Sequence, residues 1–161
     1  CMKKSLLVLL FLVVSLTGCS VRMDNSVTKI ADDKANEIIE CFNNRDTDGI
    51  KELFCDDVRN TVEIDKQIDS FFNDYHGNIS NSKVELGHSS EVLNEGKITE
   101  KYVSAYIYIE TDNDEKYTIY FAYYHILEKK PSMEGIYRIS ITDESSKEFL
   151  IGKHITVSDL K

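Results

Sequence analysis

The hydrophobic pattern of this chain changes its period once, near Gly77. Before that glycine, apolar residues recur with the spacing of helices that bury one side. After it, apolar and polar residues alternate, which is typical of strands with one buried face. Helices followed by strands predict an α+β domain, in which a layer of helices packs on one face of an antiparallel sheet.

The first expected helix begins near Val27, and Asn25 or Ser26 is suited to cap its start. One apolar stripe with helical spacing supports it. The stripe comprises Val27, Ile30, Ala31, Ala35, Ile38, Ile39 and Phe42. The polar run Asn43-Asn44-Arg45 then predicts a break in the helical layer.

Two further helices are expected before Gly77. A short one is capped by Asp46 or Thr47, and a longer one covers residues 63–75, where Asn60 and Glu63 resemble a capping box. Gly77 is expected to end the longer helix. The inward residues are Ile50, Leu53 and Phe54 in the short helix and Ile64, Ile68, Phe71, Phe72 and Tyr75 in the longer one.

The strands form a meander in the expected fold, since polar or proline-containing turns separate them. Three are strongly patterned, the run before them is a weaker strand, and a short one is expected near the end of the chain. In chain order the five cover residues 82–95, 102–109, 116–127, 136–142 and 154–157. No repeat or linker divides residues 27–161, which are expected to form one domain.

The start of the chain is patterned for export. Lys3 and Lys4 precede a short apolar stretch ending at Leu16, too short to span a bilayer. The following Leu16-Thr17-Gly18-Cys19 resembles the lipobox of bacterial lipoproteins, in which the cysteine is lipidated after cleavage. We therefore expect a signal peptide over residues 1–18, a lipidated Cys19 with a tether to residue 26, and localisation at the outer face of the bacterial cell membrane.

The charge of the chain argues against one class of partner. It has 19 basic and 28 acidic residues and a formal net charge of −9. Binding a nucleic acid backbone requires clustered Lys and Arg, so DNA and RNA are not expected partners. The expected partner is the membrane, through the lipid anchor.

The order of helices and strands resembles the NTF2-like, or cystatin-like, cone. Three phrases are more narrowly similar to small lipoproteins of low-GC Gram-positive bacteria, whose domain is classified as one of unknown function. They are Ile38-Ile39-Glu40-Cys41-Phe42, Ile50-Lys51-Glu52-Leu53-Phe54-Cys55 and Glu134-Gly135-Ile136-Tyr137-Arg138-Ile139. The resemblance covers about residues 27–145, and it implies a curved sheet around a helical layer with a cavity between them.

Two cysteines remain beyond Cys19, and the sequence leaves their state open. An exported protein can hold a disulfide between Cys41 and Cys55, which would close a loop of about 15 residues. An antiparallel arrangement of the two helices would instead separate them and leave two buried thiols. The four histidines have no metal-ligand spacing, so neither a metal nor a cofactor is expected.

His125 is the candidate site residue best suited to acid–base chemistry. It shares strand parity with Tyr117, Phe121 and Tyr123, so these four side chains would line the cavity if their face of the strand is the concave one. A histidine there could serve as a general base, although no partner acid is evident.

These observations favour a lipid-anchored, extracytoplasmic NTF2-like module that does not catalyse a reaction and binds a small apolar ligand or an envelope protein. Two alternatives stay open at this point. One is a small isomerase-like or cyclase-like enzyme with His125 as base, and the other is an assembly module that forms a homodimer through its sheet.

Overall fold

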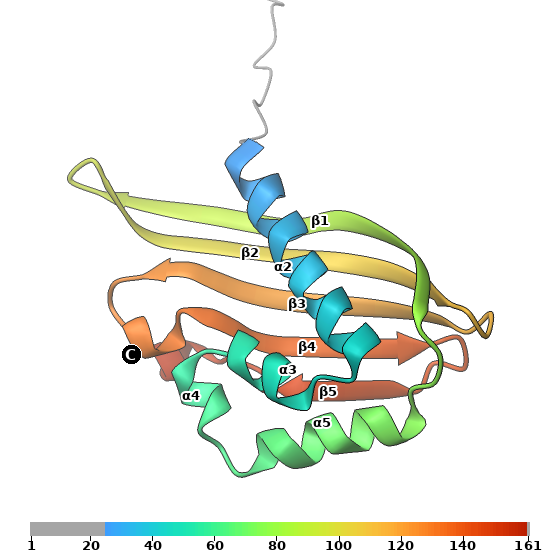
Figure 1. Ribbon diagram of the computed structural model, residues 1–161. Helices are drawn as coiled ribbons and strands as arrows, with labels where there is room; N and C mark the ends of the chain where they lie inside the picture. Colours follow the sequence, from blue (N-terminus) through green and yellow to red (C-terminus); the bar gives the residue numbers. More distant parts are fainter. Residues whose placement is uncertain (1–24, 161) are drawn as a thin grey trace, which may run out of the picture.

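The computed structural model describes residues 25–160, and Figure 1 shows their arrangement. Four helices come first and a meander of five strands follows. The helices are α2 (Asn25–Asn44), α3 (Thr47–Leu53), α4 (Asp56–Arg59) and α5 (Glu63–Asp74). The strands are β1 (Ile79–Asn94), β2 (Lys97–Thr111), β3 (Lys116–Leu127), β4 (Gly135–Asp143) and β5 (Glu148–Gly152), with 3₁₀ turns at Pro131–Met133 and Val157–Leu160. The predicted α+β class is confirmed.

The five strands form one sheet in chain order, and each pairs antiparallel with the next. The sheet is not closed into a barrel. β1 and β2 are the longest strands, with 16 and 15 residues, so their hairpin extends well beyond the rest of the sheet (Figure 1). This sequential antiparallel pairing is the meander that the alternating pattern predicts.

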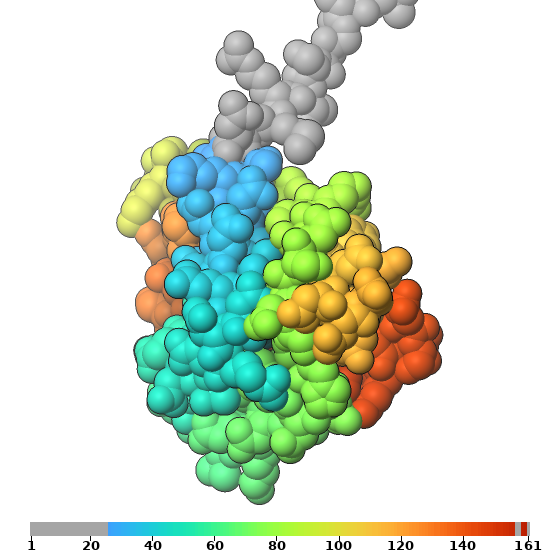
Figure 2. Space-filling view, turned by 45° about the vertical axis from the view of Figure 1, so that its right-hand side comes forward, coloured from blue at the N-terminus to red at the C-terminus, as the bar shows by residue number. Residues whose placement is uncertain are grey.

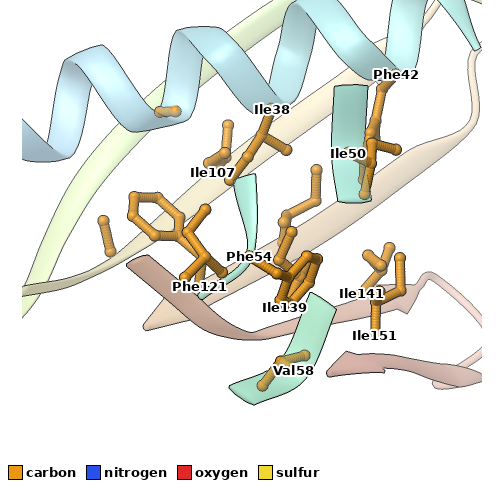
Figure 3. Close-up of a cluster of buried hydrophobic side chains, with 14 of the residues drawn as sticks. Ile38, Phe42, Ile50, Phe54, Val58, Ile107, Phe121, Ile139, Ile141 and Ile151 are labelled. Atoms are coloured by element: carbon orange, nitrogen blue, oxygen red, sulfur yellow. The ribbon is translucent and has the colours of Figure 1, made fainter. Parts of the chain in front are cut away.

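The hydrophobic core lies between the helices and one face of the sheet. α2 crosses this face, and its buried residues repeat with helical spacing from Val27 through Ile38 to Phe42. Figure 3 shows side chains from α2, α3, α4 and the strands meeting in this layer. Phe42, Ile50, Phe121 and Ile139 are fully buried there. The space where the NTF2-like resemblance implies a cavity is therefore occupied by packed side chains.

Arg45, in the break between α2 and α3, turns the chain and connects this break to the end of α5. Its backbone φ is +50°, in the left-handed region, which turns the chain sharply after α2. Its guanidinium donates to the backbone oxygen of Tyr75 at 2.9 Å and to that of Phe72. These are carbonyls at the end of α5, which lack partners within the helix. Of the two predicted caps for α3, Asp46 and Thr47, the structure selects Asp46, because its carboxylate accepts the N–H of Gly49 at 2.8 Å.

One glycine explains part of the motif that begins at Glu134. Gly135 has a φ of +127°, and a Cβ on it would lie 2.8 Å from the backbone N of Cys55. The Cys55 N–H donates to the carbonyl of Ile136 at 2.8 Å, and Phe54 forms a parallel bridge with Ile136. Gly135 therefore allows the segment between α3 and α4 to pack directly on the start of β4.

Three local predictions were wrong. Asn60 does not cap α5, because its side-chain amide donates to the Asp56 carbonyl and closes α4, a helix that the sequence pattern did not predict. Phe54 lies just after α3 in extended backbone. Residues 154–157 are not a strand, because Glu148–Gly152 takes the edge position beside β4.

Candidate functional site

Most tyrosines of the sheet lie on the face away from the helices. In β2, alternate residues from Val103 to Ile109 point into the core, so Tyr102, Tyr106 and Tyr108 point the other way. The pairing of β2 with β3, and of β3 with β4, places further tyrosines beside them. We call this set the tyrosine face, comprising Tyr102, Tyr106, Tyr108, Tyr120, Tyr124 and Tyr137.

The rings of the tyrosine face contact one another across strands. Tyr106 and Tyr120 have centroids 5.1 Å apart, and Tyr102 and Tyr124 have centroids 5.4 Å apart. Tyr106 and Tyr108, two residues apart on β2, are nearly parallel, with a 17° interplanar angle. Such contacts stabilise aromatic pairs beyond simple burial. The rings therefore form two groups in contact, one around Tyr106 and one around Tyr124.

Three hydroxyl groups of this surface, those of Tyr120, Tyr124 and Tyr137, stay protonated at neutral pH. Burial, with a hydrogen bond to Tyr102, raises the pKa of Tyr120 to about 12. Burial also raises the pKa of Tyr124 and, together with a hydrogen bond to Tyr102, that of Tyr137. The Tyr102 and Tyr120 hydroxyl oxygens lie 3.2 Å apart. The face therefore presents hydroxyl groups that can donate and accept hydrogen bonds.

Part of the tyrosine face is open to solvent. Tyr106 is 39% exposed and Tyr108 is 40% exposed, whereas the helices α2 to α5 cover the opposite face (Figure 1). Charges of both signs accompany the tyrosines on the regularly paired part of this face. They are Lys83, Lys116 and Arg138 against Glu85, Glu110 and Glu148. The local charges therefore balance, although the chain as a whole is acidic.

The four residues predicted to line a cavity do not share one. Phe121 is fully buried in the core, and Tyr117 is 7% exposed, with its hydroxyl donating to Glu115 at 2.8 Å. Only Tyr123 and His125 border a common hollow. The alternation that grouped the four residues holds from Tyr117 to Tyr123 and is interrupted at His125.

The interruption is a bulge in β3. Tyr124 pairs with Tyr102 on β2, but the next pair is Ile126 with Lys101, so His125 is the extra residue. A bulge changes where a side chain points. The His125 ring is exposed, and its Nδ1 lies 3.2 Å from the Tyr123 hydroxyl. The side chain therefore lies at the surface, against a tyrosine and outside the core.

Tyr123 and His125 line an open groove of about 410 Å³, here called the His125 groove. It lies between α2, the α3–α4 segment and the start of β4. Its other lining residues are Lys34, Glu37, Glu52, Leu53, Phe54, Asp56, Arg59, Glu134 and Gly135. Several of its charges already have partners within the groove: Lys34 pairs with Glu37 at 2.6 Å, and Arg59 pairs with Glu52 at 2.7 Å. The groove is polar and open to solvent.

Cys41 and Cys55 are free thiols in the structure, so the candidate disulfide between them is not formed. Each thiol packs in a different place, which is the physical reason. Cys55 is buried with its Sγ 4.0 Å from the Sδ of Met133, whereas the Cys41 Sγ lies beside Gly49. Burial raises the pKa of both thiols, which keeps them protonated.

Two observations concern metals and membranes. In the described part of the chain, no three side chains of His, Cys, Asp or Glu gather where they could hold a metal ion. Among residues 25–160, no helix is long and apolar enough to cross a bilayer. The expected signal peptide, Cys19 and most of the expected tether lie outside the described residues.

The fold and the two surfaces define an α+β domain with a helical layer on one face of an open sheet and a tyrosine-rich opposite face. Residues 37–144 match the model of the family described as domain of unknown function (DUF5104). The match covers more than half of the chain, and the chain belongs to that family. No match to it was found among curated proteins.

Proposed function

We propose that this protein is a lipid-anchored NTF2-like module at the outer face of the cell membrane, which binds a partner and does not catalyse a reaction. The tyrosine face is its binding surface, and the partner is a second copy of the domain. The observation that carries the proposal is the set of six tyrosines on the sheet face opposite the helices, whose rings form two groups joined by the hydroxyl contact between Tyr102 and Tyr120.

The composition of this face suits protein binding. Tyrosine is enriched in protein interfaces and among the residues that contribute most to binding, because its ring offers apolar area and its hydroxyl a polar contact. Ser104, Ala122 and Ser140 lie between the rings and are almost fully buried. Large aromatic side chains that project beside small residues make an uneven surface, and another aromatic surface can pack into its depressions.

The size and charge of the face fit a second copy. Five strands about 4.8 Å apart and about nine residues long span roughly 20 by 30 Å, or about 600 Å² in projection. A standard interface buries about 800 Å² of accessible surface per partner, and a corrugated face of this projection is comparable. Because the six charges on the regularly paired part of the face balance, a two-fold pairing can place acids of one copy against bases of the other.

The position of His125 supports binding over catalysis. A general base works when its pKa is tuned and the reacting proton lies within hydrogen-bond reach. His125 is exposed on a bulge beside a tyrosine hydroxyl, and the interior is filled with packed side chains. This arrangement gives the alternative of a cavity enzyme less support than the sequence alone gave it.

The anchor is supported by the sequence alone. Leu16-Thr17-Gly18-Cys19 follows a short apolar stretch in the order that resembles a lipobox, and α2 begins only six residues after Cys19. Lipid labelling of cells that produce the full chain tests it. Label incorporation should be lost in Cys19→Ala, whereas equal labelling of this variant would show that the anchor is wrong.

Sedimentation equilibrium of the full chain in density-matched detergent tests the pairing. The wild-type protein should show a concentration-dependent dimer, and Tyr106→Ala with Tyr108→Ala should shift it to monomer. Val62→Ala, which changes an exposed apolar residue between α4 and α5, is the matched control and should remain dimeric. A monomeric wild type at all concentrations would contradict the choice of partner.

A further inference from the structure

The tip of the β1–β2 hairpin exposes two adjacent apolar side chains. Leu93 is 63% exposed and Val92 is 46% exposed. The turn after them is tight, since Glu95 and Gly96 both have positive φ values of 50° and 83°. Exposed apolar residues at a projecting tip are suited to contact an apolar partner. Nothing in the proposed pairing through the tyrosine face uses them.

This tip lies at the same end of the molecule as the start of α2. The Nζ of Lys101 on β2 donates to the Oγ of Ser26 at 3.0 Å and forms an ion pair with Glu91 on β1 at 2.6 Å. The hairpin continues about four residues beyond Lys101, a projection of roughly 13 Å at the usual strand rise. Figures 1 and 2 both show the hairpin tip, in yellow-green, at the end where α2 begins in blue.

The chain length before α2 sets how far this end can be from the membrane. Between Cys19 and Asn25 there are six residue steps, which span at most about 20 Å when fully extended. A lipid on Cys19 would therefore keep the start of α2 within that distance of the bilayer. The projection of the hairpin is long enough to cover most of this gap.

We propose that Val92 and Leu93 insert into the interfacial layer of the lipid bilayer to which Cys19 anchors the protein. This inference rests on the proposed lipid anchor. Two apolar side chains alone bind a bilayer weakly, but the anchor raises their local concentration at its surface. The two contacts together orient the domain, which leaves the tyrosine face free to meet a neighbouring anchored copy.

The net charge near the hairpin tip determines which lipid headgroups favour insertion. Residues 91–101 contain Glu91, Glu95 and Glu100 against Lys97 and Lys101, a slight acidic excess. An anionic surface would repel this region, so insertion is stronger in zwitterionic than in anionic bilayers.

The chain contains no tryptophan, so a single introduced Trp reports its own surroundings. The full lipidated chain carrying Leu93→Trp is reconstituted into phosphatidylcholine vesicles, and its emission and its quenching by acrylamide are measured. We expect a blue-shifted emission and several-fold weaker quenching than in Val62→Trp. Val62 is 73% exposed between α4 and α5, so it provides a matched control.

The outcomes separate the inference from the anchor. Lipid labelling is measured on the same samples. A labelled protein whose Trp at position 93 is quenched as strongly as the Trp at position 62 would overturn the inference and leave the anchor intact. Absence of label would overturn both. Weaker quenching at position 93 in phosphatidylcholine than in phosphatidylglycerol vesicles would support the role of the local charge.

Discussion

The two faces of the sheet are built from the same strands, yet they have opposite properties. On the helix-covered face, Val103, Ala105 and Ile107 of β2 are fully buried among aliphatic and aromatic side chains. On the other face, Tyr106 and Tyr108 are exposed and their neighbours are tyrosines, small residues and balanced charges. Alternation along a strand thus lets one element contribute to the core and to a separate surface.

The comparison also shows that aromatic content alone does not locate a function. Phe42, Phe71, Phe72 and Tyr75 pack against one another inside the domain, with neighbouring ring centroids 4.8–6.3 Å apart. The tyrosine face has similar ring distances but keeps part of its area in solvent. Exposure therefore distinguishes a stabilising cluster from a candidate interface.

The largest expected difference between the two faces is in stability. Phe121→Ala removes a fully buried ring and should lower the free energy of unfolding by about 3–5 kcal/mol. Tyr106→Ala, on the opposite face, should lower the free energy of unfolding of the monomer by about 1 kcal/mol or less. Urea unfolding followed by circular dichroism measures both. Equal losses would mean that the tyrosine face is part of the folding core.

A second substitution tests the junction that joins the helical layer to the sheet. Gly135→Ala should destabilise by about 2–3 kcal/mol, because the added Cβ would meet the Cys55 backbone at 2.8 Å and the φ is positive. Gly96→Ala is the control, since Gly96 also has a positive φ but no atom within 4 Å of its added Cβ. Gly135→Ala should therefore lower the free energy of unfolding more than Gly96→Ala does, by the cost of the clash with the Cys55 backbone. Equal losses in the two variants would show that this close approach does not contribute to stability.

The pH dependence of stability tests buried hydroxyls on both faces. Burial raises the pKa of Tyr75, in the core, and of Tyr120, on the tyrosine face, each to about 12. Since both values lie above that of an unfolded tyrosine, their contribution is complete below about pH 10 and is lost as the pH rises towards 12. Urea melts between pH 9 and pH 12 should show a loss on the order of 1–2 kcal/mol, which Tyr75→Phe should reduce. An unchanged loss in that variant would exclude Tyr75 as a source.

Removing a tyrosine hydroxyl at neutral pH should destabilise the protein on the tyrosine face but not in the core. Within the described residues, the buried Tyr75 hydroxyl has no hydrogen-bond partner, so Tyr75→Phe should be neutral or stabilising. Tyr120→Phe removes the hydrogen bond with Tyr102 and should cost about 1 kcal/mol. Thermal melts compare the two, and a destabilised Tyr75→Phe would indicate a partner that the structure does not contain.

The smallest effect is expected at His125. Its ring is exposed and contacts Tyr123, so His125→Ala should change the free energy of unfolding by about 0.5 kcal/mol or less. The dimer measured by sedimentation should also be unchanged, because the His125 groove is separate from the tyrosine face. A lost dimer or a large destabilisation would connect the two surfaces.

Prediction from sequence was most accurate where one residue pattern governed a long element. β3 was expected at residues 116–127 and is found at Lys116–Leu127, because its alternation is uninterrupted for most of its length. It was least accurate for short elements. α4 has four residues, too few for a periodic pattern, and its one buried side chain, Val58, joins a core whose other members lie far away in the sequence.

The candidate cavity shows the limit of parity arguments. Tyr117, Phe121, Tyr123 and His125 share parity, but a bulge at His125 changes the direction of the last side chain. The bulge arises from the pairing of β3 with β2, and this pairing joins residues that are not neighbours in the sequence. The local pattern of β3 therefore does not reveal the bulge. The sequence does show that Tyr102, Tyr106 and Tyr108 lie on one side of β2. Only the structure shows that the helices cover the other side, so that these tyrosines form part of the exposed face.

By itself, the sequence determined that helices precede an antiparallel meander, the buried stripe of α2 and the alternation of β2 and β3, because each depends on neighbouring residues. It also supplies the argument for lipidation at Cys19. Only the tertiary structure decided that the interior is filled, that Cys41 and Cys55 lie apart, that Arg45 caps α5 and that the tyrosines gather on one face. These features depend on contacts between residues far apart in the chain, whose geometry is set by how the helical layer packs on the sheet.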